Sequence, residues 1–162
     1  MSRKPPHDPA FAAHDHAACI ADAIAAAERR CAEAGLRLTP IRRRVLELLL
    51  REHRAMGAYD VLDRLREEGL GSQPPTAYRA LDFLVAHGFA HRVERLNAFV
   101  ACARPGLAHS PAFLICRACD QVAEADAGTV GDLLDGGPPG FAADSAVVEV
   151  AGLCRDCREG GG

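Results

Sequence analysis

The chain has 162 residues, of which 49% are hydrophobic and 25% are charged, and its formal net charge is −3. These values are typical of a water-soluble protein with one ordinary domain or two small ones. No apolar run approaches the roughly 20 residues that cross a bilayer, so we expect no membrane partner. The net charge, taken alone, also argues against a nucleic-acid partner.

The distribution of charge along the chain changes that last conclusion. Residues 35–95 contain eleven Arg against eight Asp and Glu, a net charge of +3. Residues 103–162 contain four Arg against nine Asp and Glu, a net charge of −5. A basic first half and an acidic second half suggest that only the first half faces a polyanion.

The N-terminus does not have the pattern of a secretory signal. Arg3 and Lys4 are basic, but the next apolar stretch, Ala17–Ala27, contains Asp22 and no convincing cleavage site. We therefore expect a cytoplasmic protein whose thiols are reduced.

Helix signals begin after a tail, residues 1–14, which contains three prolines, has no periodicity and is predicted to be disordered. An alanine-rich helix is predicted from about Asp15 to Ala34, and Gly35 is a favourable residue to end it. Thr39 then supplies an N-cap and Pro40 occupies the first position of a second helix. Apolar residues recur at helical spacing beyond this point, as an amphipathic helix requires.

Two more helices and a hairpin follow. A third helix covers Ala58–Glu68, and a fourth starts near Thr76 and ends at Gly88. The segments Phe89–Arg95 and Ala98–Cys102 alternate like strands around a short Leu96-Asn97 turn. Helices followed by a β-hairpin indicate a winged helix-turn-helix, which we assign to residues 15–102. The fourth helix is then the recognition helix.

The fourth helix carries residues that suit contact with bases. On a helical wheel, one face holds Ala77, Leu81, Leu84 and Val85. The opposite face, which we expect to be exposed, holds Arg79, Asp82, Phe83 and Ala86. Thr76 and Arg79 lie in the first turn, and a guanidinium can donate two hydrogen bonds to guanine O6 and N7. The alternative for Arg79 is a solvated side chain on an amphipathic helix. Tyr59, at the start of the third helix, can hydrogen-bond a phosphate or contact a thymine methyl group.

Two CxxC pairs, Cys116/Cys119 and Cys154/Cys157, are the strongest chemical signal in the chain. Each pair can point both sulfurs the same way, and two pairs complete a closed tetrahedral zinc shell, which is typical of a structural site. A redox motif or disulfides are the alternatives. They are disfavoured because a redox CxxC occurs singly on a βαβ pattern and disulfides need an oxidising compartment.

Residues 112–162 are predicted to form a small second domain after a hinge at residues 103–111. Its expected elements are strands Ala112–Cys116 and Gln121–Ala125, a helix Asp126–Leu134, a loop Gly136–Gly140 and a strand Phe141–Val150. The expected fold class is therefore α+β, with a winged helix-turn-helix followed by a zinc-stapled domain. A small sheet with one helix buries little surface, so zinc and a second subunit should stabilise it.

These motifs together resemble the ferric uptake regulator family of metal-responsive repressors. The matching segments are Leu36–Arg42, Ala58–Leu62, Pro74–Leu84 and the two CxxC pairs. The resemblance runs from about residue 20 to 157, and the third segment is similar to the zinc-sensing branch. It implies a homodimer that binds double-stranded DNA through N-terminal winged helices and dimerises through C-terminal domains. The matching segments contain Arg37, Arg42 and Tyr78, which we also predict to contact DNA.

The resemblance also implies a second, regulatory zinc site, so that each subunit would bind two Zn²⁺ ions. His91, Cys102, His109 and Glu124 match the regulatory ligands of the zinc-sensing branch position by position. Ligands from the wing, the hinge and the second domain would make zinc binding constrain how the domains face each other. Taken singly, each has an ordinary alternative as a surface or core residue. The iron-sensing branch has a histidine cluster before the first CxxC, where this chain has only His109.

We therefore expect a zinc-responsive repressor of zinc-uptake genes that binds palindromic operators as a zinc-loaded dimer. No nucleophile motif, phosphate loop or open zinc site is visible, so neither an enzyme nor a small-molecule substrate is expected. The alternatives are an iron- or peroxide-sensing relative, and a zinc-stabilised interaction module without sensing. Two zinc ions per subunit would support a sensor, and one would support the module.

Overall fold

The computed structural model describes residues 16–52, 54–71, 73–107, 109–127, 139–142 and 146–160. The chain divides into two compact units, an N-terminal unit that ends at Leu107 and a C-terminal unit that starts at residue 108. The first is mainly helical and the second contains a three-stranded sheet, which confirms the α+β class. No helix in the described ranges is long and apolar enough to cross a membrane. The predicted tail, residues 1–14, lies outside the described residues.

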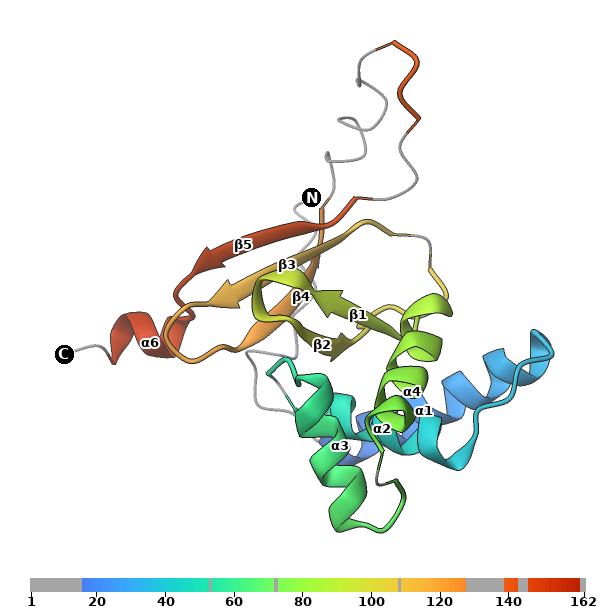
Figure 1. Ribbon diagram of the computed structural model, residues 1–162. Helices are drawn as coiled ribbons and strands as arrows, with labels where there is room; N and C mark the ends of the chain where they lie inside the picture. The colour runs from blue at the N-terminus through green and yellow to red at the C-terminus, as the bar shows by residue number, and fades with distance from the viewer. Residues whose placement is uncertain are drawn as a thin grey trace. The chain divides into compact units, whose positions relative to one another are not determined.

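The N-terminal unit begins with four helices, which Figure 1 shows in blue to light green. They are α1 (His16–Glu33), α2 (Pro40–Arg51), α3 (Ala58–Glu67) and α4 (Pro74–Ala86). Thr39 caps α2 as predicted, since its side chain accepts a hydrogen bond from the backbone N–H of Arg42 at 3.4 Å. Gly35, with φ of +67°, follows α1 in the left-handed conformation that ends helices.

The helices pack around one hydrophobic core. Val45 of α2, Leu62 and Leu65 of α3, and Leu81 and Leu84 of α4 are at most 1% exposed. Each buried leucine stabilises the fold by roughly 1.5–3 kcal/mol relative to an exposed one. This core fixes α4 against α2 and α3, the contact on which a helix-turn-helix depends.

The details of α4 differ from the prediction in two respects. The helix starts at Pro74, two residues before the predicted start, because proline suits the first helical turn, where a backbone N–H has no partner. Val85, predicted on the apolar face, is 37% exposed, and Ala80 is buried instead. The buried face of α4 is therefore rotated slightly from the apolar face that the helical wheel predicted.

An ion-pair network joins the second and third helices. Arg44 of α2 donates to both carboxylate oxygens of Glu68, at 2.6 and 2.7 Å, and to Glu47 at 2.8 Å. The hydrogen bonds from Arg44 lower the pKa of Glu68. A bidentate pair of this kind fixes the orientation of both partners, so it helps to hold the end of α3 on α2.

The wing of this unit is the hairpin of β1 (Ala90–Val93) and β2 (Ala98–Ala101). The predicted two-residue turn is wrong, since a 3-10 helix, η2 (Glu94–Leu96), leads into Asn97 at φ 46°. Backbone hydrogen bonds of 2.8 and 2.9 Å also join Phe99 of β2 to Met56 in an isolated antiparallel β-bridge. The hairpin is thus tied to the segment before α3.

The C-terminal unit contains a sheet in the order β4–β3–β5, in orange to red in Figure 1. Its elements are β3 (Pro111–Cys116), β4 (Val122–Asp126), β5 (Val148–Gly152) and the short helix α6 (Arg155–Glu159). β3 pairs antiparallel with β4 and parallel with β5. The first two strands agree with the prediction to within one residue at each end.

The later part of this unit differs from the prediction. The expected strand Phe141–Val150 is wrong in extent, since Phe141 and Val147 are not in a strand and β5 continues to Gly152. Asp126 ends β4 rather than starting a helix, and the rest of the predicted helix, residues 128–134, lies outside the described residues. Most of the predicted loop Gly136–Gly140 lies outside them as well. The helix α6 was not predicted.

Candidate metal centres and nucleic-acid interface

The sheet register of the C-terminal unit brings the two CxxC pairs together. Cys116 is the last residue of β3, and the parallel register places it opposite Gly152 of β5. Cys154 follows two residues later as the N-cap of α6, which contains Cys157. Cys119 lies in the tight β3–β4 turn, where the Asp120 N–H donates to the carbonyl of Cys116 at 2.9 Å. Residues far apart in the chain therefore meet at one end of the sheet.

The four sulfurs fit one tetrahedral metal ion. Their ligand atoms all lie within 4.8 Å of one another, and the Sγ atoms of Cys119 and Cys154 are 3.8 Å apart. Zn–S bonds of about 2.3 Å in a tetrahedron give a sulfur–sulfur separation of about 3.8 Å. None of the seven cysteines, all within the described ranges, forms a disulfide. Zinc is the ion that four thiolates at this spacing would hold.

The pKa values of these thiols show why the cluster suits a cation. Backbone N–H groups of Cys154 and Ala118 stabilise the Cys116 thiolate and lower its pKa to about 6. Hydrogen bonding with the side chains of Cys154 and Cys119 raises the pKa of Cys157 to about 12. Four thiolates this close repel one another, so full ionisation requires a bound positive charge. A divalent ion supplies that charge.

Apart from the four-cysteine cluster, two side chains of types that bind metals lie on the wing. His91 is opposite Val100 in the hairpin, and Cys102 is two residues further along, so both lie on the same face. The Cys102 N–H donates to the carbonyl of Phe89 at 2.9 Å, which continues the ladder past β2. The ligand atoms of His91 and Cys102 lie within 4.8 Å of each other. The wing therefore presents one imidazole and one thiol side by side.

The C-terminal unit presents a matching pair. Nε2 of His109, just before β3, lies 2.6 Å from Oε1 of Glu124 on β4. Both side chains are zinc ligands in proteins, and here they already face each other. The candidate zinc ligands of the chain are thus the four cysteines together with His91, Cys102, His109 and Glu124.

The predicted DNA-contacting side chains of α3 and α4 are placed at the surface. Tyr59 is 63% exposed and Tyr78 is 43% exposed, and their rings meet edge to face with centroids 6.5 Å apart. Arg79 is exposed beside Tyr78 in the first turns of α4. Thr76 is partly buried, and its side chain faces Gly71 in the turn before α4. Three of these four side chains are therefore exposed in the part of the fold that reads DNA in a helix-turn-helix.

The other two predicted DNA-contacting residues are not equivalent. Arg37 is exposed, whereas Arg42 is partly buried, with its guanidinium 3.7 Å above the ring of Phe83. The prediction that Phe83 faces solvent is wrong, because Arg42 and His87 both pack on its ring. The contact between Arg42 and Phe83 was not predicted, and no local signal in the sequence points to it.

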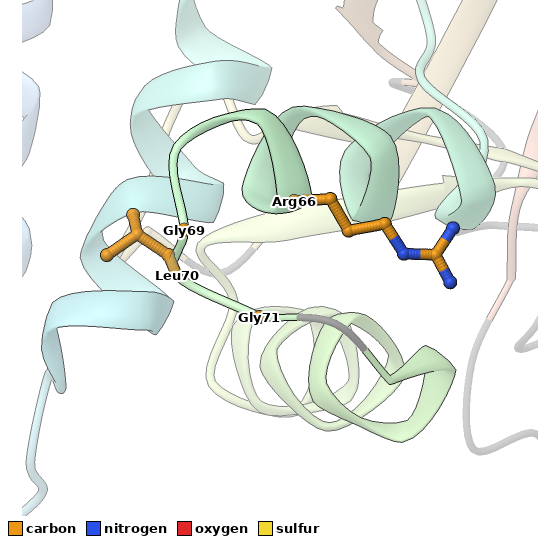
Figure 2. Close-up of a pocket in the computed structure, with 4 residues that line it drawn as sticks. All are labelled: Arg66, Gly69, Leu70 and Gly71. Carbon is orange, nitrogen blue, oxygen red and sulfur yellow. The ribbon is translucent and has the colours of Figure 1, made fainter.

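A hollow lies at the turn between α3 and α4. Figure 2 shows its lining residues, Arg66, Gly69, Leu70 and Gly71. These four residues include no nucleophile, no general base and no metal ligand. These lining residues therefore offer no catalytic group.

Comparison with known proteins identifies the class to which this fold and these ligands belong. Residues 33–134 match the ferric uptake regulator family model. The chain is 43% identical over 141 residues to the zinc uptake regulation protein of Escherichia coli K12, covering 84% of this chain and 81% of that protein. The chain belongs to the ferric uptake regulator family, as predicted.

The solved structures point to one branch of this family. A zinc uptake regulator complexed with zinc and DNA is 41% identical, with a TM-score of 0.84 over 88% of this chain and 97% of that chain. The crystal structure of holo XcZur is 45% identical, with a TM-score of 0.75 over 84% of this chain and 96% of that chain. Within the family the chain groups with the zinc uptake regulators. These proteins are regulators rather than enzymes, which confirms the non-catalytic prediction.

Proposed function

We propose that this protein is a zinc-responsive repressor of transcription that acts in the cytoplasm on zinc-uptake genes. It binds palindromic double-stranded operators as a homodimer when it is loaded with zinc. The observation that carries the proposal is the division of the second ligand set between the two units. Neither His91 with Cys102 nor His109 with Glu124 forms a four-ligand shell alone, but the two pairs together complete one.

The two zinc sites have different roles in this proposal. Cys116, Cys119, Cys154 and Cys157 form a closed shell that stabilises the C-terminal unit. The divided set uses nitrogen, sulfur and oxygen ligands, which suit zinc better than ferrous iron and allow reversible binding. An iron- or peroxide-sensing protein is accordingly the less favoured alternative, and the named relatives are zinc regulators.

Residues 15–102 form the DNA-binding domain in this proposal. Tyr59, Thr76, Tyr78 and Arg79 contact bases and phosphates in the major groove, and Arg37 and Arg42 contribute from the loop before α2 and its first turn. The net charge of +3 over residues 35–95 supports this assignment, as does the complex of a relative with DNA. Two α4 helices would then enter successive major grooves about one helical turn apart.

Residues 112–162 form the dimerisation domain. Leu114 of β3 and Val150 of β5 are paired in the sheet register, yet they are 41% and 48% exposed. Leu153, which follows β5, is 40% exposed. Neighbouring apolar side chains of this kind suit burial against a second copy of the chain.

Zinc sensing depends on residues 103–111, which act as a hinge. Without zinc at the divided set, the hinge allows many orientations of the DNA-binding domains, and only a fraction fit the operator. The apparent affinity for DNA falls by that fraction. When the four ligands share one ion, this freedom is lost and the competent orientation prevails.

Replacing Cys102 by Ser tests sensing separately from folding. The variant should retain one zinc ion per subunit, the fold and the dimer, but zinc should no longer raise its operator affinity. We suggest measuring zinc per subunit and DNA binding against buffered free Zn²⁺, Fe²⁺ and Mn²⁺. Cys19→Ser, at an exposed position of α1, is the matched control and should behave like the wild type. A Cys102→Ser protein with unchanged zinc dependence would contradict the proposal.

The zinc count of the wild-type protein also decides between classes of function. Two ions per subunit support the sensor. One ion per subunit, with DNA binding that ignores free zinc, would instead support a zinc-stabilised interaction module.

A further inference from the structure

Arg42 has an unusual position for a cation. It is the third residue of α2, and the positive end of the helix dipole lies at that end of the helix. The first turn contains no acidic residue to offset the charge. The side chain instead folds back over the preceding loop, where Nη1 donates a hydrogen bond of 2.7 Å to the carbonyl oxygen of Arg37.

The same guanidinium covers an aromatic ring of the recognition helix. Its central carbon lies 3.7 Å from the centroid of Phe83, within the range of a cation–π contact. Phe83 packs against the hydrophobic core and also meets the ring of His87, with centroids 4.6 Å apart. Arg42 therefore joins three segments, namely the loop that carries Arg37, the start of α2 and the middle of α4.

The neighbouring arginines of α2 make different contacts. Arg43 pairs with Glu28 and Arg44 pairs with Glu68, so carboxylates offset their charges. Both contacts of Arg42 described above are to uncharged groups, a carbonyl and a ring. A swing of the Arg42 guanidinium outward to a phosphate would break its contacts with the carbonyl and the ring. Arg37 is exposed on the loop that Arg42 holds, and it can reach a phosphate without losing such contacts.

We propose that Arg42 is a positioning residue of the DNA-binding surface. It holds the loop that carries Arg37 against α4, so that Arg37 and the exposed face of α4 meet DNA in a fixed relation. Arg42 does not itself bind a phosphate. This inference rests on the proposed function and replaces one of its direct DNA contacts, that of Arg42, with a positioning role.

The test is a salt titration of DNA binding by zinc-loaded protein, with a duplex that the wild-type protein selects from a randomised pool. Arg42→Lys keeps the charge but lacks the planar guanidinium, which can stack on a ring while its N–H groups donate hydrogen bonds in the same plane. Phe83→Leu keeps Arg42 but removes the ring. Each should weaken binding about fivefold or more, as expected for the loss of a partly buried cation–π contact. The slope of log K against log salt should stay unchanged, and the double variant should be no weaker than the weaker single variant.

Three further variants complete the test. Arg37→Ala should reduce the salt slope by about 0.9, the effect of one lost phosphate contact. Arg43→Lys, on the exposed side of α2, should bind like the wild type. Phe83→Tyr keeps a ring under Arg42 and should restore binding. Melting temperatures and circular dichroism of each variant distinguish weaker binding from unfolding.

A direct phosphate contact by Arg42 predicts the opposite pattern. Arg42→Lys would bind nearly as well as the wild type, Phe83→Leu would have no effect, and Arg42→Ala would reduce the salt slope by about 0.9. That pattern would overturn the positioning role and leave the proposed function intact. Failure of the wild-type protein to select any DNA would overturn the proposed function, and the role of Arg42 with it.

Discussion

The N-terminal unit buries a connected cluster of 19 hydrophobic residues between Ile24 and Phe99, whereas the described part of the C-terminal unit buries six. The C-terminal unit instead has the four-cysteine cluster and exposed apolar side chains on neighbouring strands. A packed core stabilises a fold without any ligand, but a thin sheet needs a staple and a partner. The two units therefore depend on different interactions.

This difference has a consequence for regulation. A unit with its own core can keep its shape while its orientation changes. In the proposed function, zinc would therefore control DNA binding without unfolding the N-terminal unit, and the proposed stapling and sensing roles of zinc would be separable. The following predictions test this contrast, from the largest expected effect to the smallest.

Cys116→Ser should have the largest effect, because it opens the closed thiolate shell. Structural zinc contributes about 10–16 kcal/mol of apparent binding free energy in small zinc domains. The C-terminal unit should lose its zinc and unfold, and the dimer should dissociate, while the helices of the N-terminal unit remain. Zinc content, light scattering and two-dimensional NMR spectra measure these outcomes. A stable dimer with an unchanged melting temperature after chelation would contradict the stapling role.

Leu65→Ala should have the complementary effect on the N-terminal unit. Leu65 is fully buried in α3, and truncating such a leucine costs about 2–5 kcal/mol. Denaturant unfolding should show this loss, and the C-terminal unit should keep its zinc. Leu107→Ala, at a side chain that is 64% exposed, is the control and should change stability by less than about 0.5 kcal/mol. Equal effects of the two changes would argue against an independent core.

Leu114→Ser tests whether the exposed face of the sheet is a dimer interface. Burying a leucine fully is worth about 1.5–3 kcal/mol, so the change should weaken dimerisation by a comparable amount. The fold of the zinc-loaded monomer should survive, because the side chain is already 41% exposed. Sedimentation at several concentrations gives the dimer affinity. Val85→Ser, at a side chain of the other unit that is 37% exposed, should leave dimerisation unchanged.

Gly106→Ala should have the smallest effect. Gly106 has φ of +88°, and an added Cβ would lie 3.0 Å from Nε of Arg30, which itself covers the ring of Phe89. The left-handed backbone alone costs an alanine about 1 kcal/mol. Gly88→Ala, at φ +73° with nothing within 4 Å, is the matched control for that cost alone. Unfolding free energies should therefore fall more for Gly106→Ala than for Gly88→Ala, and equal losses would exclude the contact with Arg30.

Much of this protein could be predicted from its sequence, because the decisive signals are local. Thr39 and Pro40 define the start of α2, and Gly35 defines the end of α1, through backbone preferences that need no tertiary contact. Likewise, two residues between cysteines limit where their sulfurs can point. The first four helices, the wing and the four-cysteine cluster were therefore predicted within a few residues.

The tertiary structure decided what depends on contacts between distant segments. The position of β5 follows from parallel pairing with β3, more than 30 residues earlier, so the alternation around Phe141 could not define the strand. The helical wheel placed Phe83 toward solvent, but an arginine from another helix covers it. Local sequence encodes backbone preference, whereas pairing register and side-chain partners depend on which surfaces the whole chain brings together. The free energy of those contacts exceeds the local preferences that the sequence displays.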